Sequence, residues 1–257
     1  MLKVLLSGCN GRMGRVISEL ASASDDITIV AGIDISKKES FTYPVYENIF
    51  DYDGPADVLV DFSNPSALTQ IIDYCLDKKI PVVLATTGYS KEQVELIEQA
   101  SSRIPVFRSS NMSVGICLIT ELARQAASLL GPDFNIEITE KHHNKKLDAP
   151  SGTAASIADA IAEVLPYRAE FVYGRHSASK RREVNEIGIH SLRGGTIVGD
   201  HEILFAGNDE LIEIRHTALS RSIFANGAVK AAKFIAEQKP GLYNMRDLVN
   251  SIINPAQ

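Results

Sequence analysis

The chain has 257 residues, of which 45% are hydrophobic and 23% are charged, and its formal net charge is −6. This length and composition are typical of a globular protein with one large domain or two modest ones, and we expect two. The negative charge argues against a nucleic-acid backbone as the main partner, because phosphate binding needs clustered Lys and Arg side chains.

The cysteines and the apolar runs indicate a cellular compartment. Cys9, Cys75 and Cys117 are widely spaced and form no CxxC pair, which predicts neither a disulfide framework nor a zinc site. The apolar run after Met1 is too short for a signal peptide, and no apolar stretch suggests a membrane span. We therefore expect a cytoplasmic chain with reduced thiols and no membrane partner.

The first 112 residues alternate short apolar runs with helical patterns. Runs rich in Val, Ile and Leu that do not alternate with polar residues are typical of buried parallel strands. Such runs occur at 3–6, 27–33, 58–61, 82–85 and 106–107. Helical patterns occur at 13–23, 65–76 and 91–100. This alternation predicts an α/β domain with a Rossmann-type doubly wound parallel sheet, covered on both faces.

The pattern changes after residue 112. Helical patterns are expected at 114–130 and at about 151–165, and strands at 135–141, 186–192, 196–205 and 211–218. The basic, polar stretch 168–182 is expected to be a mobile loop. Helical patterns return at 222–238 and after Tyr243. We therefore predict an α+β domain at residues 113–219, inserted into a dinucleotide-binding domain made of residues 1–112 and 220–257.

A glycine-rich turn joins the first predicted strand to the first predicted helix. It runs Gly8-Cys9-Asn10-Gly11-Arg12-Met13-Gly14, so its spacing is GxxGxxG and not the common GxGxxG. Such a turn directs backbone N–H groups and the positive end of a helix dipole at a pyrophosphate. Asp34 follows about 20 residues later, where a carboxylate can accept hydrogen bonds from an adenosine ribose. A plain tight turn with a strand cap is the alternative interpretation.

The sequence leaves the choice of nucleotide open. The carboxylate of Asp34 favours NADH because it repels the extra phosphate of NADPH, whereas Lys37 and Lys38 can supply compensating positive charge. We expect both nucleotides to be used.

Polar segments follow the later strands, where ligands of open α/β sheets bind. They are 61–63, Thr86-Thr87-Gly88 and Ser109-Ser110-Asn111-Met112. We expect them to line the nicotinamide side, although each segment alone is equally consistent with a turn or a helix cap.

The segment 140–154, EKHHNKKLDAPSGTA, combines proton donors with a helix start. His142, His143 and Lys146 lie in a connection, and 151–153 begin the next helix. Proton donors beside the free N–H groups of a helix start suit an anionic substrate that must be protonated. A solvated basic loop before a capped helix is the alternative. We expect no metal site, because neighbouring His side chains diverge in extended backbone and no HExxH pattern is present.

The pattern HHxxKxDAPSGT at 142–153, together with GxxGRMG at 8–14, resembles the 4-hydroxy-tetrahydrodipicolinate reductase family, also called dihydrodipicolinate reductase. The resemblance spans the whole chain, and the twelve-position His-to-Thr pattern is specific to that family. Further matching stretches are TTG at 86–88, NMSVG at 111–115, HSLRGG at 190–195, GDH at 199–201 and SRxxFAxGA at 220–228.

The resemblance implies NAD(P)H-dependent reduction of a small dicarboxylated cyclic imine in the diaminopimelate route to lysine. It makes His142 the general acid/base and Lys146 the proton donor, and it places His143, Gly152 and Thr153 at the substrate carboxylates. The residues that it places at the cofactor are Gly8, Cys9, Asn10, Gly11, Arg12, Met13, Asp34, Ala85, Thr86, Thr87, Ser109, Ser110, Asn111, Met112 and Arg221. Ala85 stands where the family usually has Gly, so its methyl group can crowd the nicotinamide side.

The resemblance also implies a homotetramer in which strands of the second domain meet at the subunit interface. Alternating apolar residues in these strands fit packing within one subunit equally well. Two other functions stay open from the residues alone. A dehydrogenase of the same plan for a sugar or an amino acid would keep the glycine turn and use a different loop. A non-catalytic nucleotide-binding module would leave the His–Lys loop unexplained.

Overall fold

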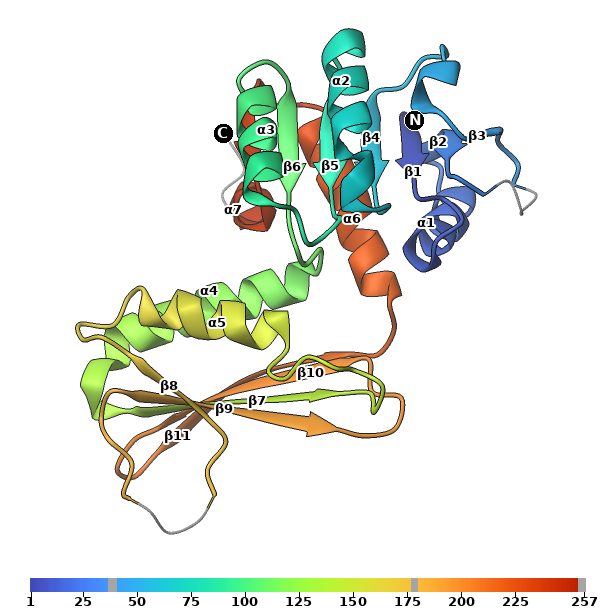
Figure 1. Ribbon diagram of the computed structural model, residues 1–257. Helices are drawn as coiled ribbons and strands as arrows, with labels where there is room; N and C mark the ends of the chain where they lie inside the picture. Colours follow the sequence, from blue (N-terminus) through green and yellow to red (C-terminus); the bar gives the residue numbers. More distant parts are fainter. Residues whose placement is uncertain (37–40, 177–179, 254–257) are drawn as a thin grey trace. The chain divides into compact units, whose positions relative to one another are not determined.

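The computed structural model describes residues 1–36, 41–176 and 180–253. It divides into two compact units, drawn in Figure 1. The first unit is Met1–Val114 with Arg221–Gln257, and the second unit is Gly115–Ser220. Lys37 and Lys38, which we considered for NADPH binding, lie outside the described residues, as do residues 177–179 of the expected mobile loop.

The first unit is built on a seven-stranded sheet in the order β12-β6-β5-β4-β1-β2-β3. All of its neighbouring strands are parallel. The strands are β1 (Leu2–Ser7), β2 (Ile27–Ile33), β3 (Val45–Tyr46), β4 (Val58–Asp61), β5 (Val82–Leu84), β6 (Pro105–Arg108) and β12 (Gly241–Tyr243). The strand order reverses between β1 and β4, which is where open α/β sheets bind their ligands.

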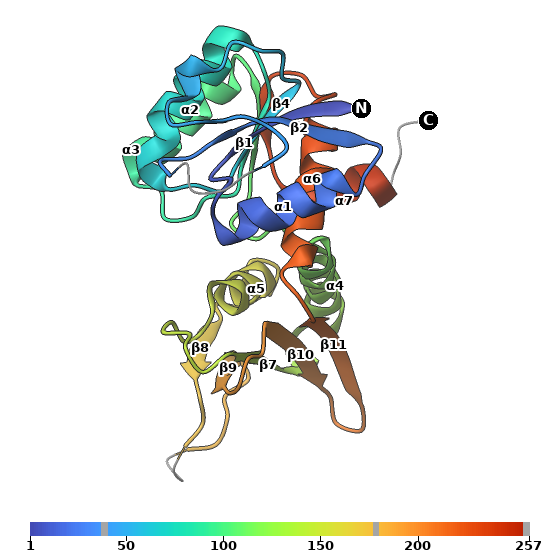
Figure 2. The same cartoon turned by 90° about the vertical axis from the view of Figure 1, so that its right-hand side faces the viewer.

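Helices cover both faces of this sheet (Figure 2). One face carries α2 (Leu68–Lys78) and α3 (Lys91–Ser101), and the other carries α1 (Arg12–Ser22), α6 (Ser222–Ile235) and α7 (Met245–Ile253). Short 3-10 turns, η1 (Ile49–Asp51) and η2 (Pro65–Ala67), lie in the connections. The predicted doubly wound parallel sheet is confirmed.

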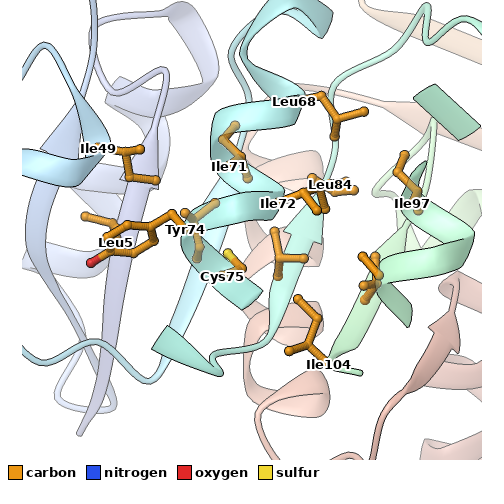
Figure 3. Packing of buried hydrophobic residues seen from close by; sticks show 14 of the residues in the cluster. Leu5, Ile49, Leu68, Ile71, Ile72, Tyr74, Cys75, Leu84, Ile97 and Ile104 are labelled. Carbon is orange, nitrogen blue, oxygen red and sulfur yellow. The ribbon is translucent and has the colours of Figure 1, made fainter. Parts of the chain in front are cut away.

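The core under α2 and α3 explains why the strand runs do not alternate. Leu5 and Leu84 of the sheet pack with Ile72 and Cys75 of α2 and Ile97 of α3, all buried (Figure 3). Each fully buried side chain of this size contributes roughly 1.5–3 kcal/mol of transfer free energy, so a strand covered on both faces needs apolar residues at every position.

Two strands of the first sheet were not predicted. The strands β3 and β12 have two and three residues, too few for a periodic pattern. The strand β12 pairs in parallel with β6, so Gly241–Tyr243 forms the edge strand on that side of the sheet.

The second unit is a five-stranded mixed sheet in the order β11-β10-β7-β9-β8. Its strands are β7 (Asn135–His142), β8 (Glu170–Tyr173), β9 (Glu186–Arg193), β10 (Gly199–Ala206) and β11 (Leu211–Ala218). The strand β10 is antiparallel to β7 and β11, whereas β9 is parallel to β7 and β8. The helices α4 (Val114–Leu130) and α5 (Gly152–Ala162) both lie on one side of this sheet in Figures 1 and 2, and η3 (Gly131–Asp133) follows α4.

Strand side chains alternate between the two faces of the second sheet. Ile136 and Ile138 of β7 and Ile187 and Ile189 of β9 are buried in one cluster with α4 and α5. The side chains at the intervening positions lie on the opposite face, which we call the open face. In the described part of the second unit, α4 and α5 leave the open face uncovered.

The expectation of a mobile loop at 168–182 is wrong for its first part, because β8 lies there. Phe171 packs against the core cluster of the second unit. Arg175 and Arg182 are held by Glu137, at 2.8 Å and 3.1 Å from its Oε1. The basic residues that follow β8, two of which are paired with Glu137 of β7, concealed this four-residue strand.

The expectation that no apolar stretch approaches the length of a membrane span needs correction. Within the described residues, Val114–Asp133 is long and apolar enough to cross a bilayer, by length and composition alone. This stretch includes α4, whose Ile116, Ile119, Ala123 and Ala127 pack in the core of the second unit. A helix that covers a sheet carries a wide apolar stripe, so the core helix of a globular unit can pass the same test of length and composition.

Candidate active site

The glycine turn between β1 and α1 accepts no side chain at two of its positions. Gly8 has φ +77°, and a Cβ there would lie 2.6 Å from the carbonyl oxygen of Phe62. A Cβ at Gly14 would lie 2.3 Å from the carbonyl oxygen of Gly8. The backbone of the turn therefore packs tightly against Phe62 and Ser63, which follow β4. The opposite side of the turn is left for a ligand.

The start of α1 is suited to an anion. Gly11 is the N-cap residue, so it supplies no side-chain acceptor for the first N–H groups of the helix, and Arg12 and Met13 begin the helix. Such N–H groups bind the phosphates of a dinucleotide. Because a Cβ is excluded at Gly8 and Gly14 as well, the turn fits a pyrophosphate.

Cys9 serves packing in this turn. Its side chain is buried, and a Cβ at Gly32 would lie 2.6 Å from its Sγ. Burial, with a smaller effect from Asp34, raises the pKa of the Cys9 thiol to about 11. The thiol is therefore protonated at neutral pH and unreactive. Of this residue, only the backbone is available to a nucleotide.

Asp34 lies directly beside the glycine turn, as the spacing predicts. Its Oδ2 accepts a hydrogen bond from the backbone N–H of Asn10 at 3.0 Å, and its Oδ1 accepts one from Ser36 at 3.0 Å. The side-chain amide of Asn10 donates to the carbonyl of Ser36. The carboxylate is thus fixed in place, and each of its oxygens keeps a lone pair for a ribose hydroxyl.

A pocket of about 420 Å³ opens at the carboxyl ends of β5, β6 and β12. Four of the sequence-predicted cofactor residues line it: Thr86, Thr87, Ser109 and Ser110. Sequence reasoning missed five other lining residues, Tyr89, Arg108, Leu242, Tyr243 and Asn244. The last three lie in β12 or directly after it, and β12 was not predicted.

Four other residues that we expected at the cofactor do not line this pocket. Ala85 is buried at the end of β5. The carbonyl of Asn111 accepts a hydrogen bond from the Ser109 hydroxyl at 2.7 Å. Met112 is buried, and its carbonyl oxygen lies so close to Gly227 of α6 that a Cβ there would clash. Arg221 is exposed at the N-cap of α6.

In the second unit, Glu140 of β7 is the centre of a hydrogen-bonded cluster. Its side chain is 0% exposed. The Arg193 guanidinium donates to both carboxylate oxygens, at 2.8 Å and 2.7 Å. His142 Nδ1 lies 2.6 Å from Oε2, and the backbone N–H of Ser151 donates to Oε1 at 3.0 Å. The cluster joins β7, β9 and the start of α5.

The charge of Glu140 sets the tautomer of the His142 ring. Burial opposes ionisation of Glu140, but hydrogen bonds from Arg193 and His142 outweigh it and lower the pKa of Glu140 to about 2. An ionised carboxylate only accepts hydrogen bonds, so the proton of the His142 ring lies on Nδ1. The other nitrogen, Nε2, is left for chemistry and lies 3.2 Å from the position of a Cβ on Gly199.

The loop after β7 is tied to the loop after β9. The N–H of Gly194 donates to the carbonyl of His142 at 2.9 Å, and the N–H of Asn144 donates to the carbonyl of Gly195 at 3.2 Å. Lys146 Nζ lies 2.9 Å from Asp148 Oδ2. We expected His142 in the connection, but it is the last residue of β7. Its ring is therefore held by the sheet, and His143 begins the loop.

The start of α5 presents backbone N–H groups. Ser151 caps the helix, because its Oγ accepts the N–H of Ala154 at 3.1 Å. Gly152 and Thr153 follow, and among the described residues no atom lies within 4 Å of a Cβ placed on Gly152. This helix start therefore has room for a carboxylate, which helix N-termini bind.

His201 of β10 supports the cap from behind. Its Nε2 lies 3.2 Å from Ser151 Oγ, and its ring meets the His142 ring edge-on at 5.3 Å. Burial lowers the pKa of His201 to about 4, with a smaller effect from the charge of His142. A neutral His201 ring can accept the Ser151 hydroxyl proton at Nε2, provided that the ring proton lies on Nδ1.

Sequence reasoning missed Arg193, His201 and the role of Glu140. The signal was present in the strand pattern, because Glu140 occupies the position that continues the buried series Ile136 and Ile138. A buried carboxylate needs a partner. The described residues contain no group of three or more His, Cys, Asp or Glu side chains arranged to hold a metal ion.

Sequence comparison identifies relatives along the whole chain. The family model described as dihydrodipicolinate reductase, N-terminus, matches residues 2–112, and the one described as dihydrodipicolinate reductase, C-terminus, matches residues 115–249. A 4-hydroxy-tetrahydrodipicolinate reductase of Clostridium tetani is 51% identical over 251 residues, covering 98% of each chain. One of Caldanaerobacter subterraneus subsp. tengcongensis is 51% identical over 97% of this chain and 98% of its own.

Comparison of solved structures agrees. The dipicolinate-bound dihydrodipicolinate reductase from Paenisporosarcina sp. TG-14 has a TM-score of 0.81 and 27% sequence identity, with 96% of this chain and 99% of that chain covered. A probable dehydrogenase from Thermotoga maritima, with a TM-score of 0.64 and 13% identity, shares the fold. From these matches over both halves, the chain belongs to the dihydrodipicolinate reductase family.

Proposed function

We propose that the chain reduces 4-hydroxy-2,3,4,5-tetrahydrodipicolinate to 2,3,4,5-tetrahydrodipicolinate with loss of water, using His142 and Lys146 as its proton-transfer groups. Membership of the family makes the chain an NAD(P)H-dependent oxidoreductase of lysine biosynthesis. The observation that carries the residue roles is the Glu140–His142 pair, which lies beside the open start of α5 and before the loop that carries Lys146.

The first unit is proposed to bind the nucleotide. The N–H groups at the start of α1 are assigned to the pyrophosphate, Asp34 to the adenosine ribose, and the pocket lined by Thr86, Thr87, Ser109 and Ser110 to the nicotinamide half. When bound, the reduced nicotinamide supplies a hydride to the substrate ring. Both NADH and NADPH are expected to bind, because the chain belongs to a family of NAD(P)H-dependent reductases.

The second unit is proposed to hold the substrate and its protons. A dicarboxylate needs two sets of donors, which the N–H groups of Gly152 and Thr153 and the ring of His143 provide. Glu140 holds the Nδ1 proton of His142, so that Nε2 can bind a proton and deliver it to the substrate. Lys146 donates a proton or balances negative charge as the 4-hydroxyl group leaves.

A kinetic assay tests these roles. Freshly generated substrate is mixed with NADH or NADPH, and cofactor oxidation is followed by the near-ultraviolet absorbance of the reduced nicotinamide. We expect His142→Gln and Lys146→Ala each to lose roughly 10²- to 10⁴-fold in kcat, because each removes a positioned proton donor. Thr153→Val should mainly raise KM, because it removes a binding contact.

Lys145→Ala is the matched control, since Lys145 is the exposed neighbour of Lys146 in the same loop. It should keep normal turnover. If His142→Gln and Lys146→Ala both turned over at the rate of the unchanged chain, the assigned roles would be wrong.

We also propose a cytoplasmic homotetramer. The three cysteines are free thiols, which suits a reducing compartment. The open face of the second unit supports an interface between subunits, because Leu192 and Leu211 lie on it with 48% and 66% of their surface exposed. Exposed apolar side chains on an uncovered sheet face are typical of protein contacts.

A further inference from the structure

The buried carboxylate of Asp61 has no role in the reaction as described. Asp61 ends β4 next to the point where the strand order reverses, and it is 1% exposed. Its backbone joins both neighbouring strands, since its carbonyl accepts the N–H of Ala85 at 3.0 Å and β1 pairs with β4 through Ser7 and Asp61. An ionisable group at this place costs free energy unless its hydrogen bonds are satisfied.

Neutral donors surround this carboxylate. The Thr86 hydroxyl donates to Oδ2 at 2.7 Å, and the Ser63 hydroxyl and backbone N–H donate to Oδ1 at 2.6 Å and 3.1 Å. The Ser7 hydroxyl also hydrogen-bonds to it, and the Tyr89 hydroxyl lies 3.5 Å from Oδ2. These donors come from the ends of three adjacent strands, where the nucleotide is proposed to bind.

Two of these contacts reach the proposed nucleotide site. Thr86 lines the pocket at the carboxyl ends of β5, β6 and β12. Ser63 follows Phe62, and the Phe62–Ser63 peptide is the backbone against which Gly8 packs, with a Cβ at Gly8 lying only 2.9 Å from Ser63 N. The same carboxylate therefore holds both Ser63, against which the glycine turn packs, and Thr86 of the pocket wall.

A threonine hydroxyl has one proton and two lone pairs. Because its proton is committed to Asp61, the Thr86 oxygen can present only lone pairs to the pocket. We propose that Asp61 is a positioning residue that fixes Thr86 as a hydrogen-bond acceptor, so that the pocket selects an N–H or O–H donor of the nicotinamide half of the nucleotide. This inference rests on the proposed function of the first unit.

Nucleotide binding, measured by titration calorimetry of the full chain without substrate, tests the proposal. Asp61→Asn replaces one acceptor oxygen with an N–H donor. The Thr86 hydroxyl oxygen then accepts that N–H, and its own proton is turned toward the pocket. We expect it to bind NADH roughly 10- to 100-fold more weakly, which is the effect of losing one or two buried hydrogen bonds. Asp57→Asn is the matched control, because Asp57 precedes the same strand, is exposed and also accepts a backbone N–H. It should bind NADH normally.

Thr86 variants separate positioning from a general loss of structure. Thr86→Val should weaken binding as much as Asp61→Asn does, Thr86→Ser should restore it, and the double variant Asp61→Asn with Thr86→Val should be no weaker than the worse single variant. Circular dichroism and the thermal midpoint show whether each variant is folded. If Asp61→Asn fails to fold, Thr86→Val and Thr86→Ser decide, and a folded Thr86→Val with normal affinity overturns the proposal.

The 3-acetylpyridine analogue of NADH, which lacks the carboxamide N–H groups, identifies the donor. If the carboxamide is the donor, the unchanged chain binds the analogue more weakly than NADH, and Asp61→Asn removes that difference. If a ribose hydroxyl is the donor, Asp61→Asn weakens both ligands by the same factor. A folded Asp61→Asn chain that binds NADH within about twofold of the unchanged chain contradicts the proposal, since the expected loss is roughly tenfold or more. An unchanged chain that binds neither NADH nor NADPH contradicts the proposed function itself.

Discussion

At the scale of single residues, the contacts of a buried ionisable side chain determine whether it is charged. Glu140 and His201 show the two directions of the effect. Glu140 is buried with a guanidinium and stays ionised, whereas His201 is buried beside another histidine and stays neutral. Burial alone opposes charge in both, so the difference comes from the Arg193 contact. The His142 ring contacts both, since its Nδ1 lies 2.6 Å from Glu140 Oε2 and its edge meets the His201 ring.

The lowered pKa of His201 predicts a loss of stability in mild acid. The pKa falls from an ordinary value of 6.5 to about 4, so between these pH values the unfolded chain binds a proton that the folded chain does not. Stability from this group is therefore complete above about pH 6.5 and falls on acidification by roughly 1.4 kcal/mol for each pH unit.

The measurement compares thermal unfolding of the unchanged chain with that of His201→Gln from pH 7 to pH 4, a window of about 3 units around the ordinary histidine pKa. As the pH falls, the thermal unfolding midpoint of the unchanged chain should decrease more than that of His201→Gln. A difference that stays constant with pH would show that His201 is not held neutral.

At the scale of elements, the candidate site residues lie in turns and at strand ends. The sequence predicted the positions of these residues better than it predicted the residues that they contact. The glycine turn was readable because its spacing follows a buried strand, and the structure indeed brings Asp34 to it. The sequence could not show that Arg193 is a partner of Glu140. The strands β7 and β9 are separated by 43 residues along the chain, and only the fold brings them side by side. The strand β8 was concealed for the same reason, since its neighbouring charges are satisfied by a distant strand.

Substitution of Gly14 tests the turn as an element. In Gly14→Ala the new methyl group would lie 2.3 Å from the carbonyl oxygen of Gly8, so α1 must move away from the turn. We expect destabilisation of roughly 1–3 kcal/mol and a clear loss of NADH affinity. Gly194→Ala is the control, because a Cβ there meets no described atom within 4 Å. Equal NADH affinities for the two variants would contradict the role of the turn.

At the scale of the whole molecule, each unit solves a different burial problem. Among the residues that the structure describes, helices cover both faces of the first sheet but only one face of the second sheet. The sequence predicted both architectures through strand runs that alternate or do not alternate. The pattern could not show what covers the open face, because apolar and charged residues are mixed there.

A measurement of mass tests the proposed assembly. Light scattering should give about four times the 28.0 kDa of one chain. Leu211→Arg, on the open face, should lower the measured mass, because a desolvated guanidinium without a partner opposes association. Ile252→Arg, on exposed α7 of the first unit, should leave the mass unchanged. A single-chain mass for the unsubstituted protein would exclude the tetramer.

The return of the chain to its first unit has a consequence for biosynthesis. The helices α6 and α7 and the edge strand β12 all follow residue 220, yet they complete a sheet that begins at residue 2. On the ribosome, the second unit is therefore finished while one face of the first sheet still lacks two of its helices. Exposed apolar surface of this kind attracts chaperones and other nascent chains, and the pocket wall formed by Leu242, Tyr243 and Asn244 is added only after the second unit is complete.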